Sequence, residues 1–234
     1  MAAETRRGLI VTLIVSTLAE MIVFALLLFV PAGTLGWWRA WVYLGAVLVG
    51  TIGSSLNILD ANPELLAERM KPPIQQGQSR ADKVLLPAMV AAFAAVLALA
   101  PLDVFRLHLL PKANPVASAL GLAAFIAGWW LAHRAMRENA FATPVVKDQR
   151  ARGKTVVQSG PYRIVRHPMY AGGVLVFVGT PLWLESWAAA ILALAAVGLI
   201  VLRIIAEERF LRCKLSGYAA YTKRVRYRLI PSIW

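Results

Sequence analysis

The stretch GPYRIVRHPMYAGGVLVFVGTPLWLESWAAAILALAAVGLIVLRIIA, residues 160–206, joins a polar motif to two apolar runs. Each run approaches the roughly 20 mostly apolar residues that a membrane-crossing helix needs. Only Glu185 and Ser186 lie between the runs, so they are predicted to form a tight helical hairpin. Gly160-Pro161 and Pro168 interrupt regular helix, so the motif at 160–170 is predicted to be an irregular, polar entry to that hairpin.

Four further apolar runs precede this stretch, at about residues 9–30, 38–59, 84–102 and 115–135. The chain is 59% hydrophobic and 16% charged, whereas soluble domains carry about 25% charged residues. We therefore expect an all-α fold, a polytopic transmembrane bundle of about six spans. It forms a single membrane domain over residues 1–234, with N-terminal helices in 1–136 and a core that carries the motif in 137–234.

The net charge of +13 lies in the loops between the apolar runs. This distribution is typical of membrane topology and argues against a nucleic-acid partner. With the N-terminus inside, 22 of the 25 Lys and Arg residues fall on the inner side, and only Arg39, Arg106 and Lys112 fall outside. The positive-inside rule thus predicts an N-in, C-in topology, with the motif, the basic loop before it and the C-terminal tail at the cytoplasmic face.

Smaller features make local predictions. Asn62 followed by Pro63 is typical of the start of a short helix. Its apolar residues Leu65, Leu66 and Met70 are expected to lie on the membrane surface. Gly121 and Gly128 in the fourth apolar run suit close helix packing.

Arg203 and Glu207 are four residues apart, on one face of the last predicted span, which we expect to end near Ala206. The hairpin brings them toward His167 and Tyr170. Ionisable groups at membrane depth are costly and usually functional, which favours a polar ligand site. The alternative is that Arg203 and Glu207 simply pair with each other at the interface, and the sequence leaves both interpretations open.

Several motifs in order resemble the isoprenylcysteine carboxyl methyltransferase family. They are Gly160-Pro-Tyr-Arg-x-x-Arg-His-Pro-x-Tyr170, the hairpin, Arg203-x-x-x-Glu207-Glu208-x-x-Leu211, Tyr218-x-x-Tyr221 and Leu229-Ile-Pro231. The resemblance covers about residues 147–233. It extends to the wider group of integral-membrane S-adenosylmethionine-dependent methyltransferases, including those that act on phospholipid amines. Residues 62–69 resemble a segment of bacterial members, so a bacterial inner membrane is expected.

The resemblance implies a methyltransferase core in residues 137–234, with a cytoplasm-facing pocket for S-adenosylmethionine and its product S-adenosylhomocysteine. The positions that match cofactor-contacting residues are Lys154, Thr155, Val156, Val157, Tyr162, His167, Pro168, Met169, Tyr170 and Glu207. Arg203 matches the residue that meets the substrate, and Arg203 and Glu208 are the catalytic candidates. Lys147 stands where the family has a polar residue, often glutamine, that contacts the cofactor. No metal is implied.

The chemistry of these groups fits methyl transfer to a lipophilic or lipid-modified acceptor in the bilayer. A carboxylate acceptor of the isoprenylcysteine type needs no base, and Arg203 can hold it with two hydrogen bonds. An amine acceptor, such as a phospholipid headgroup, must first lose a proton, and Glu208 or His167 is then a candidate base. A small thiol is a further alternative. A small transporter with a polar path along Arg203 and Glu207, and a scaffold without activity, are the non-enzyme alternatives.

Overall fold

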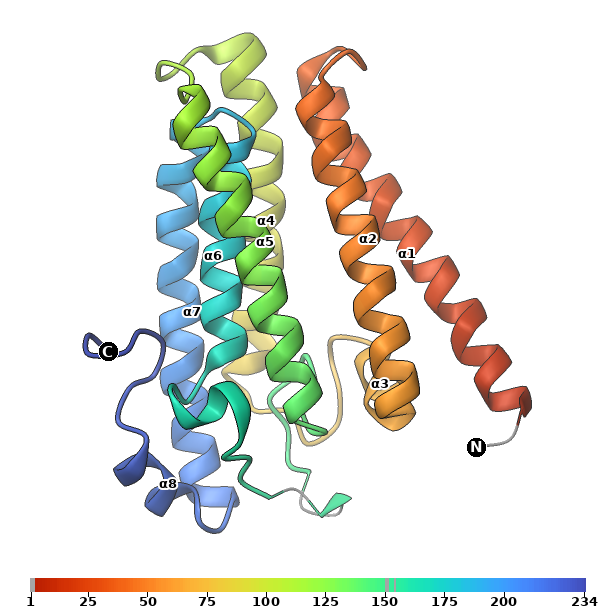
Figure 1. Cartoon of the computed structure of the whole chain (residues 1–234), viewed down its shortest axis with the longest axis vertical. Helices are drawn as coiled ribbons and strands as arrows, with labels where there is room; N and C mark the ends of the chain where they lie inside the picture. The colour runs from red at the N-terminus through yellow and green to blue at the C-terminus, as the bar shows by residue number, and fades with distance from the viewer. Residues whose placement is uncertain (1–2, 150–151, 154) are drawn as a thin grey trace.

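The computed structural model describes residues 3–149, 152–153 and 155–234, and these residues form helices joined by loops (Figure 1). They contain no β-strand, only isolated bridges between Gln78 and Lys147 and between Lys112 and Ser186. The predicted all-α class is therefore confirmed. The elements in order are α1 (Ala3–Ala32), α2 (Trp38–Ala61), α3 (Pro63–Arg69), α4 (Asp82–Leu102), the π-helix η1 (Asp103–Leu107), α5 (Pro115–Glu138), the 3₁₀-helix η3 (Gly160–Arg163), α6 (Pro168–Trp183), α7 (Trp187–Lys214) and α8 (Tyr218–Arg224).

Each of the six predicted apolar runs forms one helix. Within the described residues, five helices are long and apolar enough to cross a membrane, namely α1, α2, α4 together with η1, α5 and α7. The sixth, α6, is apolar but has only 16 residues, which makes it about 24 Å long against a hydrocarbon core of about 30 Å. The number of crossings and the N-in, C-in orientation stay predictions.

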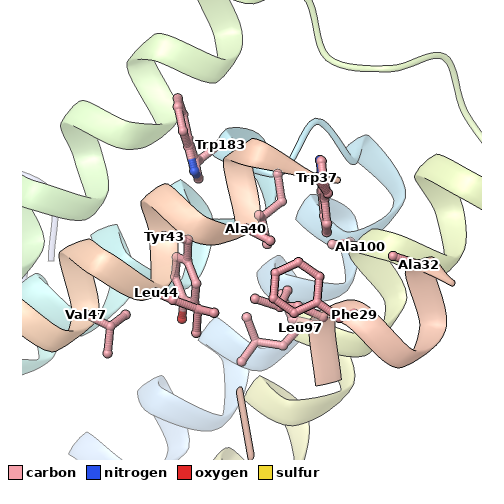
Figure 2. Packing of buried hydrophobic residues seen from close by; sticks show 14 of the residues in the cluster. Phe29, Ala32, Trp37, Ala40, Tyr43, Leu44, Val47, Leu97, Ala100 and Trp183 are labelled. Carbon is pink, nitrogen blue, oxygen red and sulfur yellow. The ribbon is translucent and has the colours of Figure 1, made fainter. Parts of the chain in front are cut away.

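Helices α4, α5, α6 and α7 stand side by side, and α1 and α2 form a hairpin that diverges from them toward its lower end (Figure 1). The hairpin packs on the other helices near the upper end. There Phe29 of α1 and Tyr43 of α2 pack around Leu97 of α4 (Figure 2). The lower end of the molecule holds α3, the motif, α8 and the beginning of α1 (Figure 1).

The end of α7 differs from the sequence prediction. The helix continues beyond Ala206 to Lys214, so Glu207 and Glu208 lie inside it. The apolar run stops near Ala206, but the residues that follow are rich in Glu, Arg, Leu and Lys, which favour helix. As a result, α7 extends past the apolar layer and carries carboxylates on its continuation.

Helix α3 also corrects a prediction. Asn62 caps it as expected, since its side-chain oxygen accepts a hydrogen bond from the Leu65 amide at 3.0 Å. Leu65 and Leu66, however, are buried against Ile58 and Ala142 instead of lying on a membrane surface. An apolar helix face suits a protein surface as well as a lipid one, and here the loop after α5 covers it.

Gly121 and Gly128 lie in a close helix contact, as expected, and the structure shows that the partner of α5 is α6. A Cβ placed on Gly128 would lie 2.5 Å from the carbonyl oxygen of Gly172, and one on Gly179 would lie 2.5 Å from that of Gly121. The glycines of the two antiparallel helices thus meet in pairs, seven residues apart on each helix. Their missing side chains let the backbones touch, and this fixes where α6 begins and hence where the motif sits.

Gly172→Ala is expected to destabilise the protein by about 1–3 kcal/mol, because the added methyl group overpacks this contact. Gly173→Ala is the matched control, since a Cβ at Gly173 meets nothing within 4 Å and alanine favours helix. Thermal unfolding of the purified protein in detergent measures both. Equal midpoints for the two variants would contradict the close contact.

A candidate ligand cavity at one end of the bundle

A cavity of about 290 Å³ opens where the loop after α5, the motif, the end of α7 and α8 come together. Most of the residues that the sequence singled out line it: Thr155, Val156, Val157, Tyr162, His167, Met169, Tyr170, Arg203 and Glu207. Pro168 and Glu208 are buried but do not line the cavity, and Lys154 falls outside the described residues. The structure therefore brings His167 and Glu207 into one cavity, as the hairpin predicted, while their roles stay predictions.

Arg203 and Glu207 do not pair with each other. The Tyr170 hydroxyl donates a hydrogen bond to Glu207 Oε2 at 2.7 Å. Arg203 Nε instead donates to Asp82 Oδ1 at 2.7 Å, and its Nη2 donates to the Pro144 carbonyl. The simple interface pair considered from the sequence is thus excluded, and Glu207 faces the cavity next to a tyrosine.

Asp82, at the start of α4, is a buried junction that the sequence did not reveal. It is 2% exposed and accepts hydrogen bonds from Arg203, from Gln78 Nε2 at 2.8 Å and from the Val146 amide at 2.9 Å. These bonds satisfy both carboxylate oxygens. Asp82 thereby fixes Arg203 and one wall of the cavity in a single arrangement.

Glu208 forms a second buried junction, behind the cavity wall. Arg166 Nε lies 2.6 Å from its Oε1, His167 Nε2 lies 3.2 Å from the same oxygen, and Arg228 Nε lies 3.1 Å from its Oε2. Glu208 is 3% exposed. Because both oxygens are engaged, this placement favours a role through His167 over direct contact with an acceptor.

The C-terminal tail closes the cavity on one side. The backbone amides of Arg166 and His167 donate to the carbonyls of Tyr227 and Arg228, both at 2.9 Å, and the Tyr221 hydroxyl donates to the Tyr162 carbonyl at 2.8 Å. Burial raises the pKa of the Tyr221 hydroxyl to about 12. The tail is thus hydrogen-bonded to the motif, and α8 forms part of the wall.

The Tyr218 hydroxyl is buried in this wall without a hydrogen-bond partner among the described residues. Tyr218 lines the cavity together with Tyr162 and Tyr221. Buried polar groups normally have partners, so a bound ligand or water would complete this site. Three tyrosine rings and a carboxylate form surroundings that suit a cationic, aromatic ligand.

Several lining residues could not be found from sequence motifs, among them Arg69, Asn139 and Gln149. Lys147, at the position of the family's cofactor-contacting residue, does not line the cavity; it contacts Glu68 Oε2 at 2.5 Å and Gln75. Gln149, two residues later, lines the cavity instead. The glutamine at 149, in the same loop as Lys147, was therefore the sequence feature that could have predicted this lining residue.

Glu68 is held between two cations, Lys147 and Lys71. Burial raises the pKa of this carboxyl, but the hydrogen bonds and charges of the two lysines outweigh burial and lower it to about 2. Glu68 is thus fully ionised at neutral pH and its charge is already matched. Within the described residues, no group of three or more His, Cys, Asp or Glu side chains is arranged to hold a metal ion.

These features define an all-helical membrane-type fold with a cavity at one end that both polar and apolar residues line. Comparisons with known proteins relate this fold to a known class. Residues 116–216, from α5 to the end of α7, match the phospholipid methyltransferase family. The cobalt-zinc-cadmium resistance protein CzcN of Cupriavidus metallidurans is 38% identical over 74 residues, which cover 31% of this chain and 34% of that protein. The chain therefore spans about a third of the length of this curated relative.

The fold is similar to that of the eukaryotic intramembrane Ras methyltransferase, isoprenylcysteine carboxyl methyltransferase. The superposition has a TM-score of 0.53 at 20% identity and covers 91% of this chain and 73% of that one. At this identity the likeness concerns the fold. Together with the family match, it confirms the resemblance inferred from the motifs: the chain is similar to the membrane methyltransferases of the isoprenylcysteine and phospholipid groups.

Proposed function

We propose that this protein transfers a methyl group from S-adenosylmethionine to a lipophilic acceptor, and that the cavity described above is its active site. The observation that carries the proposal is the convergence of the motif and the end of α7 on one cavity, where Tyr170 and Glu207 lie side by side in the wall and share a hydrogen bond. The match of residues 116–216 to the phospholipid methyltransferase family supports it.

The residues present fit such a cofactor. Glu207 offers a carboxylate to an ammonium group or to ribose hydroxyls. The unpartnered Tyr218 hydroxyl and the Asn139 amide offer further polar contacts. The rings of Tyr162 and Tyr221 provide faces for a sulfonium cation. When bound, S-adenosylmethionine would supply an electrophilic methyl group.

The chain's own contribution is to position the acceptor and exclude water. Arg203 is fixed by Asp82 and Pro144 and lines the cavity, so its remaining N–H groups are available to a ligand there. We propose that Arg203 contacts the acceptor, in the first place a carboxylate of the isoprenylcysteine type. The apolar tail of the acceptor would lie among the helices in the bilayer, with the cavity at the cytoplasmic face.

A phospholipid amine is the second candidate acceptor, and the family match favours it. An amine must lose a proton before it attacks, and His167 lines the cavity with Glu208 directly behind it. In that case His167 would accept the proton and Glu208 would position the imidazole. A small thiol acceptor would place the same demand on His167.

Glu207→Ala and Tyr170→Phe are each expected to weaken the binding of S-adenosylhomocysteine by about 1–3 kcal/mol, the range for a lost buried polar partner. Calorimetry on the purified, detergent-solubilised protein measures this. Wild-type affinity in both variants would contradict the placement of the cofactor. If the wild-type protein shows no saturable binding of labelled S-adenosylmethionine, the transporter or scaffold alternatives replace the enzyme.

A further inference from the structure

Arg69 is a cavity residue that lies outside both the motif and residues 116–216, which match the phospholipid methyltransferase family. It is the last residue of α3 and reaches the cavity from the N-terminal half of the chain. Its Nη1 donates to the Ala142 carbonyl at 2.7 Å. That bond fixes the guanidinium against the loop after α5 and leaves its other N–H groups without acceptors among the described residues.

The three cavity arginines differ in how their charge is matched. Arg166 is paired with Glu208 and Arg203 with Asp82. Among the described residues, Arg69 has no carboxylate within ion-pair distance. Its sequence neighbour Glu68 is already engaged by two lysines. Burial lowers the pKa of the Arg69 guanidinium, which is the expected effect of a desolvated cation whose charge is not matched.

An unmatched, partly buried cation is costly, and a guanidinium with free N–H groups is suited to bind a carboxylate with two hydrogen bonds. We propose that Arg69 is a second anion-binding residue of this cavity, beside Arg203, and takes a carboxylate group of a bound ligand. The inference rests on the proposed function for the identity of that ligand. The carboxylate comes either from the amino-acid part of the cofactor or from the acceptor.

The contrast with Arg203 supports this assignment. The Arg203 charge is balanced by Asp82 at 2.7 Å, so Arg203 offers an incoming carboxylate hydrogen bonds but no net positive charge. At Arg69 the same anion would supply the missing counter-charge. The two arginines therefore divide the work: Arg203 is a fixed donor, and Arg69 provides net positive charge.

Two pairs of probes, in each of which only one member carries a carboxylate, test the proposal on the full chain in detergent. S-adenosylhomocysteine is compared with 5′-methylthioadenosine, which lacks the amino-acid group. N-acetyl-S-farnesylcysteine is compared with its methyl ester. Arg69→Gln is expected to lower affinity for a carboxylate probe at least about tenfold and to leave the affinity for its uncharged counterpart unchanged.

The outcomes separate the sources. A loss confined to S-adenosylhomocysteine assigns Arg69 to the cofactor, and a loss confined to the farnesylated acid assigns it to the acceptor. Arg163→Gln is the matched control, because Arg163 is an exposed motif residue outside the cavity, and it should change neither. Unchanged affinity of Arg69→Gln for both carboxylate probes overturns the proposal.

Arg69→Lys keeps the experiment informative if Arg69→Gln does not fold. Lysine retains the charge but not the two-pronged geometry, so a smaller loss, about threefold, is expected for the same carboxylate probe alone. Identical affinities of Arg69→Lys and wild type for every probe overturn the proposal. If the wild-type protein binds neither S-adenosylhomocysteine nor 5′-methylthioadenosine, the proposed function fails. The role of Arg69 is still supported in that case if the wild type prefers the farnesylated acid to its ester and Arg69→Gln abolishes this preference.

Discussion

Glu208→Ala is expected to destabilise the protein by about 3–5 kcal/mol, because it removes the carboxylate that a buried group of basic side chains shares. Arg166, which is 7% exposed, would be left without its ion-pair partner. His167 and Arg228 would lose the same partner. Because Arg166 also bonds to the carbonyls of Val225 and Arg226, the tail should loosen from the motif.

The preceding residue in the chain, Glu207, provides the control. Glu207→Ala removes the same charge from the same helix, but Glu207 has Tyr170 as its hydrogen-bond partner and faces the cavity. Thermal unfolding in detergent should show a much larger loss of stability for Glu208→Ala than for Glu207→Ala. Among folded protein, Glu207→Ala should show the larger loss of affinity for S-adenosylhomocysteine. A Glu208→Ala variant as stable as Glu207→Ala would mean that the buried cluster contributes little.

The C-terminal part of the site was largely predictable from the sequence, for a physical reason. Residues 160–170 and 203–208 are joined by a hairpin with a minimal turn, so membrane length and helix geometry alone bring them together. The resemblance of these motifs to a known family pointed to the same place. Predicting that His167 and Glu207 share a cavity therefore required no information about how the other helices pack.

The partners from the N-terminal half were not predictable in this way. Asp82 and Arg203 are 121 residues apart, and nothing in the hydrophobic pattern links the start of α4 to the end of α7. Arg69 read as one more inner-side basic residue, and only the packing of Leu65 and Leu66 on Ala142 turns α3 toward the cavity. Hydropathy predicts which segments are helices, whereas the pairing of buried charges depends on how those helices pack.

Variants of the Asp82–Arg203 pair can show whether Arg203 serves only to match the charge of Asp82 or also contacts the acceptor. Asp82→Asn leaves Arg203 buried and unmatched, and Arg203→Met leaves Asp82 in the same condition. Each single change is expected to destabilise the protein by about 3–5 kcal/mol. The double variant Asp82→Asn/Arg203→Met should lose clearly less than the sum, since neither charge is then left uncompensated.

Methyl-transfer activity should not follow stability across the two single variants and the double variant. If Arg203 contacts the acceptor, both variants that lack it should bind S-adenosylhomocysteine nearly as wild type does, yet transfer methyl groups to membrane lipids or lipid-modified acceptors poorly. Labelled cofactor and a membrane extract provide the assay. If the double variant recovers both stability and methyl transfer, Arg203 serves only to match the charge of Asp82. The acceptor contact would then have to come from another cavity residue, and Arg69 would be the first to test.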